Sequence, residues 1–284
     1  MIKTNNLTNS QWISKLKEII NKGQVSNPRG LRIKELINSS ICIDMNYPII
    51  SIPERKLGYK FMAREAWWIL SGRNDVESIK DYSKVISTFS NDNYHFDGAY
   101  GPRVVDQIRY IVDSLAQDLN TRQAVLTIWR ANPRASKDIP CTVSIQWLIR
   151  DGYICCIDNM RSSDIWLGVP YDIFNFTMLT GYIMLLLKER GIKNLKLGNL
   201  YLNAGSQHLY EDNWEKAQKL IQKYTEWDNL HKFEPYLFNS PIELKNYLKD
   251  LSELDIKNLK LNNINKYKIN IGRDVLMTSQ YILK

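Results

Sequence analysis

Cysteine is scarce in this sequence, with four residues among 284. No two of them are spaced as a CxxC pair or in another arrangement typical of a metal site, and neighbours in sequence rarely form a disulfide. These absences argue against a disulfide-rich secreted domain. We therefore expect a reducing compartment, no metal, and at most one thiol with a chemical role among Cys42, Cys141, Cys155 and Cys156.

Long apolar segments are also missing. The N-terminal segment MIKTNNLTNSQWISKLKEII lacks the apolar core of a signal peptide, and the most apolar stretch, DIFNFTMLTGYIMLLL, is interrupted by Asp172, Asn175 and Thr180. We expect a cytoplasmic protein without membrane contact, in which that stretch forms a core helix. Because internal repeats and low-complexity linkers are absent, residues 1–284 are predicted to form one domain.

Acidic residues are outnumbered by basic ones, 30 to 38, which gives a net charge of +8. An excess of positive charge is typical of proteins that bind an anionic partner. The lysines are spread along the chain, however, and many lie in its last third among Asn and Leu. Composition alone thus leaves open both a nucleic-acid groove and a small anionic ligand.

The pattern of apolar residues predicts a mixture of helices and strands. Amphipathic helices are expected over residues 10–22 and 106–119, and buried helices over 59–73 and 172–190. Strands are expected over residues 35–52, interrupted by a turn, and over 122–131, 141–152, 153–164 and 195–205, with a further helix beginning near Ser206. Because these elements do not alternate as a regular βαβ repeat, we predict an α+β fold with one mixed sheet packed with helices.

Two side chains are candidates for catalysis. Cys141 follows an Ile-Pro pair and opens the run TVSIQW, so its thiol could face a cleft where a loop meets a strand; the alternative is a small core hydrophobe. Glu65 lies among apolar residues of its predicted helix. Burial there would raise its pKa and suit it to acid–base catalysis, and the alternative is an ion pair with Arg64 or Arg32.

Other residues suit the binding of a phosphate. Arg161 is followed by Ser162, and a guanidinium with neighbouring hydroxyl donors can hold a phosphate by several hydrogen bonds. The alternative for Arg161 is a surface salt bridge with Asp164. Arg29, beside a glycine, and Arg122 are further candidates of the same kind.

Histidine is rare as well, with three residues in the chain. His208 in the run AGSQHLYED is predicted near the start of a helix, with Tyr210 two residues later. Such a histidine could bind a ligand, although a hydrogen-bonded core histidine is the ordinary alternative.

The order of these motifs resembles the thymidylate synthase family from about residue 12 to 235. The segment PCTVSIQWLIRDGYICCIDNMRSSDIWLGVPYDIFNF is similar to the family's nucleophile loop and its RS-x-D-x-x-LG-x-P-[FY]-N motif. REAWWILSG resembles its glutamate-bearing helix, NTRQAVLTIW its arginine strand, and AGSQHLY its histidine and tyrosine pair. Tyr100 and Gly101 match its YG turn. The resemblance implies a thymidylate synthase-like fold in which a sheet face forms a homodimer interface.

The resemblance also implies roles for the nucleotide site. Cys141 would add to carbon 6 of a pyrimidine ring, and Glu65 would order water and assist proton transfers. The 5′-phosphate would be held by Arg29, Arg161 and Ser162. Three further residues complete the implied substrate site: His208 and Tyr210 at the sugar hydroxyls, and Arg122 reaching the phosphate in the other subunit's site.

The co-substrate implied by the resemblance is 5,10-methylenetetrahydrofolate. Asp164 would contact its pterin, and the matching motif adds Leu167, Gly168 and Tyr171 to the folate site. A nucleoside monophosphate and a folate are then the expected ligands, so nucleic acid is not expected as a partner.

Asp172 departs from the family pattern, since thymidylate synthases have asparagine there. The amide matches uracil's ring N–H and its oxygen at position 4, whereas a carboxylate can accept from cytosine's exocyclic amine and from its protonated ring nitrogen. Thr142 after the nucleophile and the run NMRS are similar to the deoxycytidylate hydroxymethylase branch of the family. Asp172 is therefore predicted to select cytosine.

The resulting hypothesis is the 5-hydroxymethylation of a cytidine monophosphate, CMP or dCMP. After the folate leaves, an exocyclic methylene remains on carbon 5; water would convert it to hydroxymethyl, and hydride from tetrahydrofolate to methyl. The family's tryptophan beside this methylene is absent from KVISTFSNDN, residues 84–93. Ser87 or Phe89 would take its place and form a smaller, polar wall that admits water.

Two other functions remain open from the sequence. One is a thymidylate synthase-type methyltransferase acting on a pyrimidine nucleotide such as dUMP, and the other is a nucleotide- or RNA-binding homologue without catalysis.

Two further departures from the family pattern affect the periphery of the implied site. Gln123 replaces the second arginine of the family's pair, and residues 277–284 differ from the family's apolar C-terminal tail.

Overall fold

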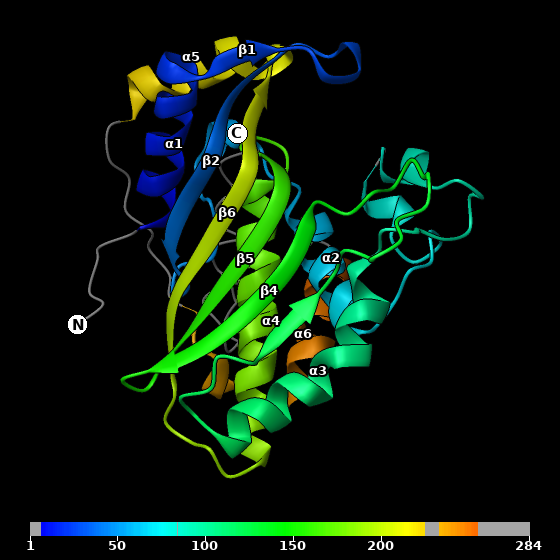
Figure 1. Ribbon diagram of the computed structural model, residues 1–284, viewed down its shortest axis with the longest axis vertical. Helices are drawn as coiled ribbons and strands as arrows, with labels where there is room; N and C mark the ends of the chain where they lie inside the picture. The colour runs from blue at the N-terminus through cyan, green and yellow to red at the C-terminus, as the bar shows by residue number, and fades with distance from the viewer. Residues whose placement is uncertain (1–6, 84, 225–232, 255–284) are drawn as a thin grey trace.

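A six-stranded mixed sheet forms the centre of the computed structural model, which describes residues 7–83, 85–224 and 233–254 (Figure 1). The strand order is β1-β2-β6-β5-β4-β3. β5 and β6 are parallel, and every other neighbouring pair is antiparallel. The strands are β1 Gln24–Ser26, β2 Ile33–Asp44, β3 Val125–Thr127, β4 Thr142–Arg150, β5 Tyr153–Asp164 and β6 Lys196–Tyr210.

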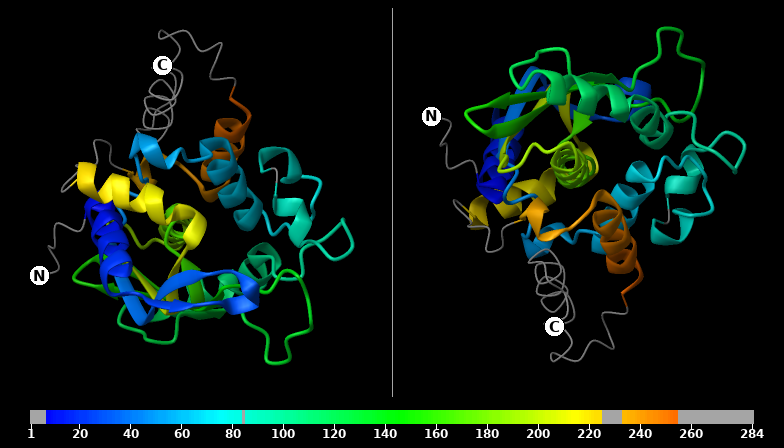
Figure 2. Two further views of the ribbon diagram at one scale, coloured as in Figure 1. Left: turned by 90° about the horizontal axis from the view of Figure 1, so that it is seen from above. Right: turned by 90° about the horizontal axis from the view of Figure 1, so that it is seen from below.

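Helices cover one face of the sheet and its edges. α4 packs on β5 and β6, and α2 and α6 pack against α4 on the side away from the strands (Figure 2). α1 packs against β2 and α5. The helices are α1 Thr8–Lys22, α2 Tyr59–Leu70, α3 Tyr100–Gln117, α4 Val169–Glu189, α5 Trp214–Lys223 and α6 Pro241–Glu253. This arrangement confirms the predicted α+β class with one mixed sheet.

α4 is the core helix that the sequence predicted from its apolar stretch. It is buried along most of its length, because the sheet lies on one side of it and α2 and α6 lie on the other. Its first turn holds Asp172, and the next turn holds Asn175, so the polar residues of the stretch lie near its N-terminal end. No described helix is long and apolar enough to cross a membrane.

The opposite face of the sheet carries polar side chains that are half-buried or exposed. Ser40 Oγ donates to Asn203 Oδ1 (2.7 Å), and Asn203 Nδ2 donates to Asn159 Oδ1 (3.2 Å). Asn159 Nδ2 in turn donates to Ser144 Oγ (3.3 Å). A row of hydrogen bonds thus runs across β2, β6, β5 and β4 on this face.

Two predictions of secondary structure were wrong. In one segment a neighbouring strand is missing, and in the other two neighbouring strands are present. Residues 48–52 are not a strand; their isoleucines are buried in irregular chain, and no strand pairs with them. β6 continues to Tyr210, where a helix had been predicted to begin at Ser206. Its last residues pair with β2 on one side and β5 on the other, so His208 lies opposite both Glu35 and Asp164.

Trp12 anchors α1 to the core, and its replacement tests the packing of this layer. Its side chain is fully buried, and its Nε1 donates to the carbonyl of Ile165 (2.6 Å). Trp12→Ala should lower the free energy of unfolding by about 3–5 kcal/mol, as large-to-small core substitutions do. Lys17→Ala, on the exposed face of the same helix, is the matched control. Equal denaturant midpoints for the two variants would contradict this packing.

Candidate active site

A half-open pocket of about 220 Å³, the inner cavity, lies between α2, α4, the start of α3 and the loop before β4. It brings together Cys141, Glu65 and Asp172, three residues from separate segments of the chain. Polar and apolar side chains share its wall. The lining residues are Glu65, Trp68, Ile69, Ile86, Phe89, Phe96, Gly98, Ala99, Tyr100, Asp138, Ile139, Pro140, Cys141, Asp172 and Asn175.

Cys141 lies directly before β4, at the predicted junction of loop and strand. Its Sγ is 3.9 Å from Ser162 Oγ and 3.9 Å from Arg161 Nη2. Burial raises the pKa of the Cys141 thiol, while the positive charge of Arg161 acts in the opposite direction. The guanidinium therefore favours the thiolate, which is the nucleophilic form of cysteine.

Arg161 is bound to the loop that carries this thiol. Its Nε donates to the carbonyl of Pro140 (2.9 Å) and its Nη2 to the carbonyl of Ile139 (2.9 Å). Its Nη1 donates to Ser162 Oγ (3.0 Å). Arg161 thus forms no salt bridge with Asp164 in this structure, so that alternative is wrong.

Glu65 points into the inner cavity from α2 and accepts a hydrogen bond from Asn175 Nδ2 (2.7 Å). Burial raises the pKa of Glu65 to about 7. The neighbouring cations are engaged elsewhere: Arg64 pairs with Glu253 and Arg32 with Glu211. The ion-pair alternative for Glu65 is therefore wrong, and its carboxyl can both give and take a proton near neutral pH.

Asp172 lies on the same cavity wall, one turn before Asn175. Burial raises its pKa well above the ordinary value, and the nearby carboxyls of Glu65 and Asp164 raise it further. Like charges in a site of low polarity cannot all ionise together. These surroundings therefore favour the protonated form of Asp172.

Asp158 is a buried carboxyl that the sequence analysis missed. It lies on β5 with no exposed surface; Thr142 Oγ1 donates to its Oδ2 (3.3 Å), and its Oδ1 has no partner among the described residues. Burial and the neighbouring Asp172 raise its pKa well above the ordinary value. The available signal was its position, because Asp158 alternates with Cys156 and Met160 on the buried face of its strand.

A second and larger depression of about 850 Å³, the outer cleft, opens beside the inner cavity. Five of the six predicted nucleotide-binding residues lie on it: Arg29, Arg161, Ser162, His208 and Tyr210. The other lining residues are Ser26, Pro28, Ile33, Glu35, Trp129, Ser136, Ile139 and Ser206. Because Ile139 lines both spaces and Ser162 neighbours the thiol, Cys141 lies where they meet.

Arg122, the sixth predicted residue, lies apart from the outer cleft. Its side chain is exposed on the loop before β3, and its carbonyl accepts from Gln146 Nε2 (2.8 Å). His208 and Tyr210 lie at the end of β6, just before the 3-10 turn Glu211–Asn213 and the start of α5. Their rings meet edge to face with centroids 5.2 Å apart, and the strand directs both toward the cleft.

The four predicted folate residues gather at the start of α4, outside the lining of both spaces. Asp164 Oδ1 accepts the backbone N–H groups of Trp166 (2.7 Å) and Leu167 (2.9 Å). Gly168 precedes the helix, and the Tyr171 hydroxyl accepts from the N–H of Gly58 (3.1 Å). Leu167 is 52% exposed and available to a ligand.

The wall near the nucleophile differs from the one predicted from residues 84–93. Ile86 and Phe89 line the inner cavity, and Ser87 does not. The 3-10 turn Ile86–Phe89 directs its first and last residues to the same side, three positions apart. Phe89, one of the two residues predicted to take the tryptophan's place, thus lines the cavity with Ile86, and this part of the wall is apolar where a polar one was expected.

Two further expectations concern the C-terminal residues and the presence of a metal site. Residues 277–284, which differ from the family's C-terminal tail, lie outside the described residues. In the described ranges, no three His, Cys, Asp or Glu side chains form a group that could hold a metal ion.

Comparison with known proteins agrees with this arrangement. The family model described as thymidylate synthase matches residues 10–271. Deoxyuridylate hydroxymethyltransferase of Bacillus phage SP01 is 29% identical over 234 residues, which cover 73% of this chain and 58% of that protein. Thymidylate synthase of Buchnera aphidicola subsp. Baizongia pistaciae (strain Bp) is 24% identical over 236 residues, 77% of this chain and 82% of that protein. The chain thus belongs to the thymidylate synthase family.

The raised pKa of Glu65 predicts a specific dependence of stability on pH. The folded-state pKa of Glu65 is about 7, whereas its ordinary value is 4.5. The contribution of Glu65 to the free energy of unfolding is therefore present in full below pH 4.5 and is lost as pH rises through 7. Glu65→Gln does not titrate and should gain up to about 3 kcal/mol over wild type across this range. Denaturant unfolding at several pH values measures the difference.

Glu189→Gln, an exposed carboxyl at the end of α4, is the control for this comparison. Its stability relative to wild type should stay nearly constant over the same pH range. A Glu65→Gln curve that runs parallel to the control would show that the carboxyl of Glu65 is not desolvated.

Proposed function

We propose that this protein transfers a one-carbon unit from methylenetetrahydrofolate to a pyrimidine nucleoside monophosphate. The observation that carries the proposal is the position of Cys141 where the inner cavity meets the outer cleft. A nucleotide with its phosphate at Arg29 and Arg161 would place its base toward Cys141. The thiolate would add to carbon 6 and make carbon 5 nucleophilic.

The roles of the remaining site residues form part of the same proposal. Glu65 exchanges protons with the ring and with ordered water, a task suited to a carboxyl with a pKa of about 7. Ser162 holds the phosphate with the two arginines, and His208 and Tyr210 hold the sugar hydroxyls. Asp164, Leu167, Gly168 and Tyr171 bind the folate at the start of α4.

We assign the base as cytosine because of Asp172. A carboxyl with a raised pKa can give a proton to ring nitrogen 3, and the carboxylate then accepts from that N–H and from the exocyclic amine. The inner cavity supports this assignment, since it places Asp172 beside Glu65 and Cys141. The substrate is then CMP or dCMP.

The product of this proposal is hydroxymethyl. The relative from phage SP01 is named a hydroxymethyltransferase, which favours water over hydride as the group that attacks the methylene. That relative is also named for deoxyuridylate, which favours uracil as a second candidate base. A neutral Asp172 has one donor and one acceptor and could pair with uracil as well.

We further propose a homodimer of one catalytic domain spanning residues 1–284. The polar row across β2, β6, β5 and β4 offers a broad sheet face for a second copy. Arg122 lies exposed and away from its own outer cleft, as a residue serving the partner's phosphate would. None of the four cysteines forms a disulfide, which suits the reducing cytoplasm.

The reaction type is tested by the fate of the folate. Hydroxymethylation leaves tetrahydrofolate, so turnover of a cytidylate should proceed without any rise in dihydrofolate absorbance. Cys141→Ser, which keeps the size of the side chain, should lose activity by more than about 100-fold. Dihydrofolate formed in step with product would establish a methyltransferase, and unchanged turnover by Cys141→Ser would refute the covalent mechanism.

The base assignment is tested by Asp172→Asn. An amide restores the pattern that matches uracil, so kcat/KM should fall about 100-fold for the cytidylate and rise for the uridylate. Competition between labelled CMP, dCMP, UMP and dUMP measures the shift. If the variant keeps the selectivity of wild type, Asp172 does not read the base.

A further inference from the structure

Asp138 lines the inner cavity together with Cys141 and Glu65, but none of the roles proposed above involves it. It lies on the loop between β3 and β4, three residues before the nucleophile. Burial raises the pKa of Asp138, whereas the N–H of Gly98 and the charge of Arg103 lower it. The carboxyl is therefore a stronger base than an exposed aspartate.

Gly98 fixes the orientation of this carboxyl. Its N–H donates to Asp138 Oδ2 (2.6 Å) and leaves Oδ1 without a protein partner among the contacts described. A Cβ atom at Gly98 would lie 2.7 Å from the backbone oxygen of Asp138 and 2.9 Å from Oδ1. Only glycine allows this close approach without displacing the Asp138 loop.

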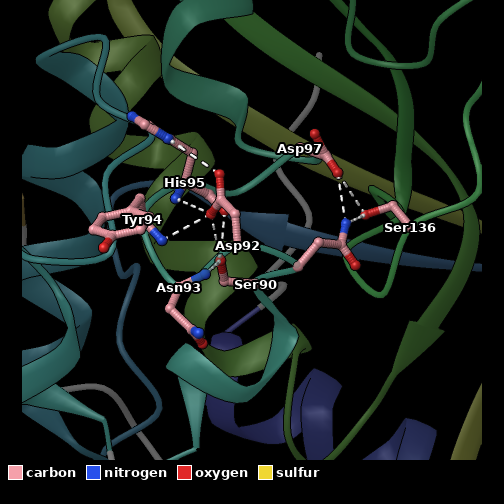
Figure 3. Close-up of polar contacts among 8 residues, drawn as sticks. Ser90, Asp92, Asn93, Tyr94, His95, Asp97 and Ser136 are labelled. Atoms are coloured by element: carbon pink, nitrogen blue, oxygen red, sulfur yellow. Dashed lines mark hydrogen bonds and ion pairs between the residues drawn. The ribbon is translucent and has the colours of Figure 1, made fainter.

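A network of polar side chains holds the loop against residues 90–97. Asp138 N–H donates to Ser136 Oγ (3.1 Å), and Ser136 Oγ donates to Asp97 Oδ2 (2.9 Å). Asn91 Nδ2 donates to both Asp97 Oδ2 (2.7 Å) and Ser136 Oγ (2.6 Å). Figure 3 shows Ser136 and Asp97 facing each other across the two segments.

Residues 90–95 are themselves a closed turn, as Figure 3 also shows. Asp92 Oδ1 accepts the backbone N–H groups of Tyr94 (2.7 Å) and His95 (2.8 Å), and Ser90 Oγ donates to the carbonyl of His95 (2.7 Å). The chain therefore supports Asp138 with a preformed scaffold, as expected for a side chain whose position matters.

We propose that Asp138 is the general base that accepts a proton from the water attacking the exocyclic methylene. This inference rests on the hydroxymethyl transfer proposed above, because hydride transfer to the methylene requires no such base. It assigns the water to Oδ1 of Asp138, because Oδ2 accepts from the N–H of Gly98.

Water adds to the methylene carbon, and the Cys141 thiolate is eliminated from carbon 6. The water oxygen forms a bond to the methylene carbon, and Asp138 takes the proton that this oxygen loses. The electrons of the exocyclic double bond move into the ring, form the double bond between carbons 5 and 6, and expel the Cys141 thiolate. The products are the 5-hydroxymethyl nucleotide, the free thiolate and protonated Asp138.

The other carboxyls of the inner cavity are less suited to this proton. Glu65 is assigned to proton exchange with the ring and its ordered water, and Asp172 is assigned to the base. Asp138 also lines this cavity, and it has neither of these roles.

The test separates the steps before water attack from the steps after it. Tritium at carbon 5 of the cytidylate is released when the exocyclic methylene forms, and hydroxymethyl product appears only after water adds. Asp138→Asn, which keeps an acceptor for Gly98 N–H, should retain folate-dependent tritium release but lose product formation by about 100-fold. Added 2-mercaptoethanol should then trap the methylene as a thioether. Lys137→Ala, an exposed neighbour on the loop, should behave as wild type.

A second variant keeps the test decisive if the amide disturbs the loop. Asp138→Ala leaves space for formate, which should restore product formation in proportion to its concentration without changing tritium release. Equal losses of release and product in Asp138→Asn, without formate rescue of Asp138→Ala, would overturn the inference. Hydroxymethyl product formed by Asp138→Asn at the wild-type rate would overturn it too. A wild-type protein that forms only methyl product would refute the proposed function itself.

Discussion

The side chain of Arg161 holds the candidate site together, because it connects the end of β5 to the loop that carries the nucleophile. Its Nε and Nη2 donate to the carbonyls of Pro140 and Ile139, and its backbone N–H donates to the carbonyl of Cys141 (2.8 Å). The planar fork of a guanidinium suits such parallel hydrogen bonds, which an ammonium cannot reproduce. The same charge lies near the thiol and faces the outer cleft.

A second constraint is the crowding of carboxyl groups behind the thiol. Glu65, Asp172 and Asp158 lie in surroundings that raise their pKa values, and Asp172 is affected by the charge of Glu65. Such groups share protons as a set. Their surroundings therefore favour the protonated forms of these carboxyls. Ring chemistry that alternates between addition and elimination depends on such exchange.

The sequence predicted the parts of the structure that short-range patterns determine. The apolar stretch predicted α4, and the position of Cys141 after Ile-Pro predicted the junction before β4. Recognition of the family motifs placed Cys141, Glu65 and Asp172 in one site before any geometry was known. Pairing between distant segments was harder to predict. His208 belongs to a strand because β2 and β5 pair with it on either side, and both partners are far from it in sequence.

Other features required the three-dimensional arrangement. Asp138 and Gly98 are forty residues apart, and no sequence pattern links them. Whether Ile86, Ser87 or Phe89 lined the cavity depended on the turn of a short 3-10 helix. Asp158 resembled an ordinary strand residue until its neighbours were visible.

The most direct test of the account is the mass of the nucleotide product. Wild-type protein is incubated with methylenetetrahydrofolate and equal amounts of CMP, dCMP, UMP and dUMP, and all nucleotides are weighed by mass spectrometry. The account predicts the gain of one CH₂O on CMP or dCMP and no change in the uridylates. A gain of CH₂, or a CH₂O found on a uridylate, would contradict it.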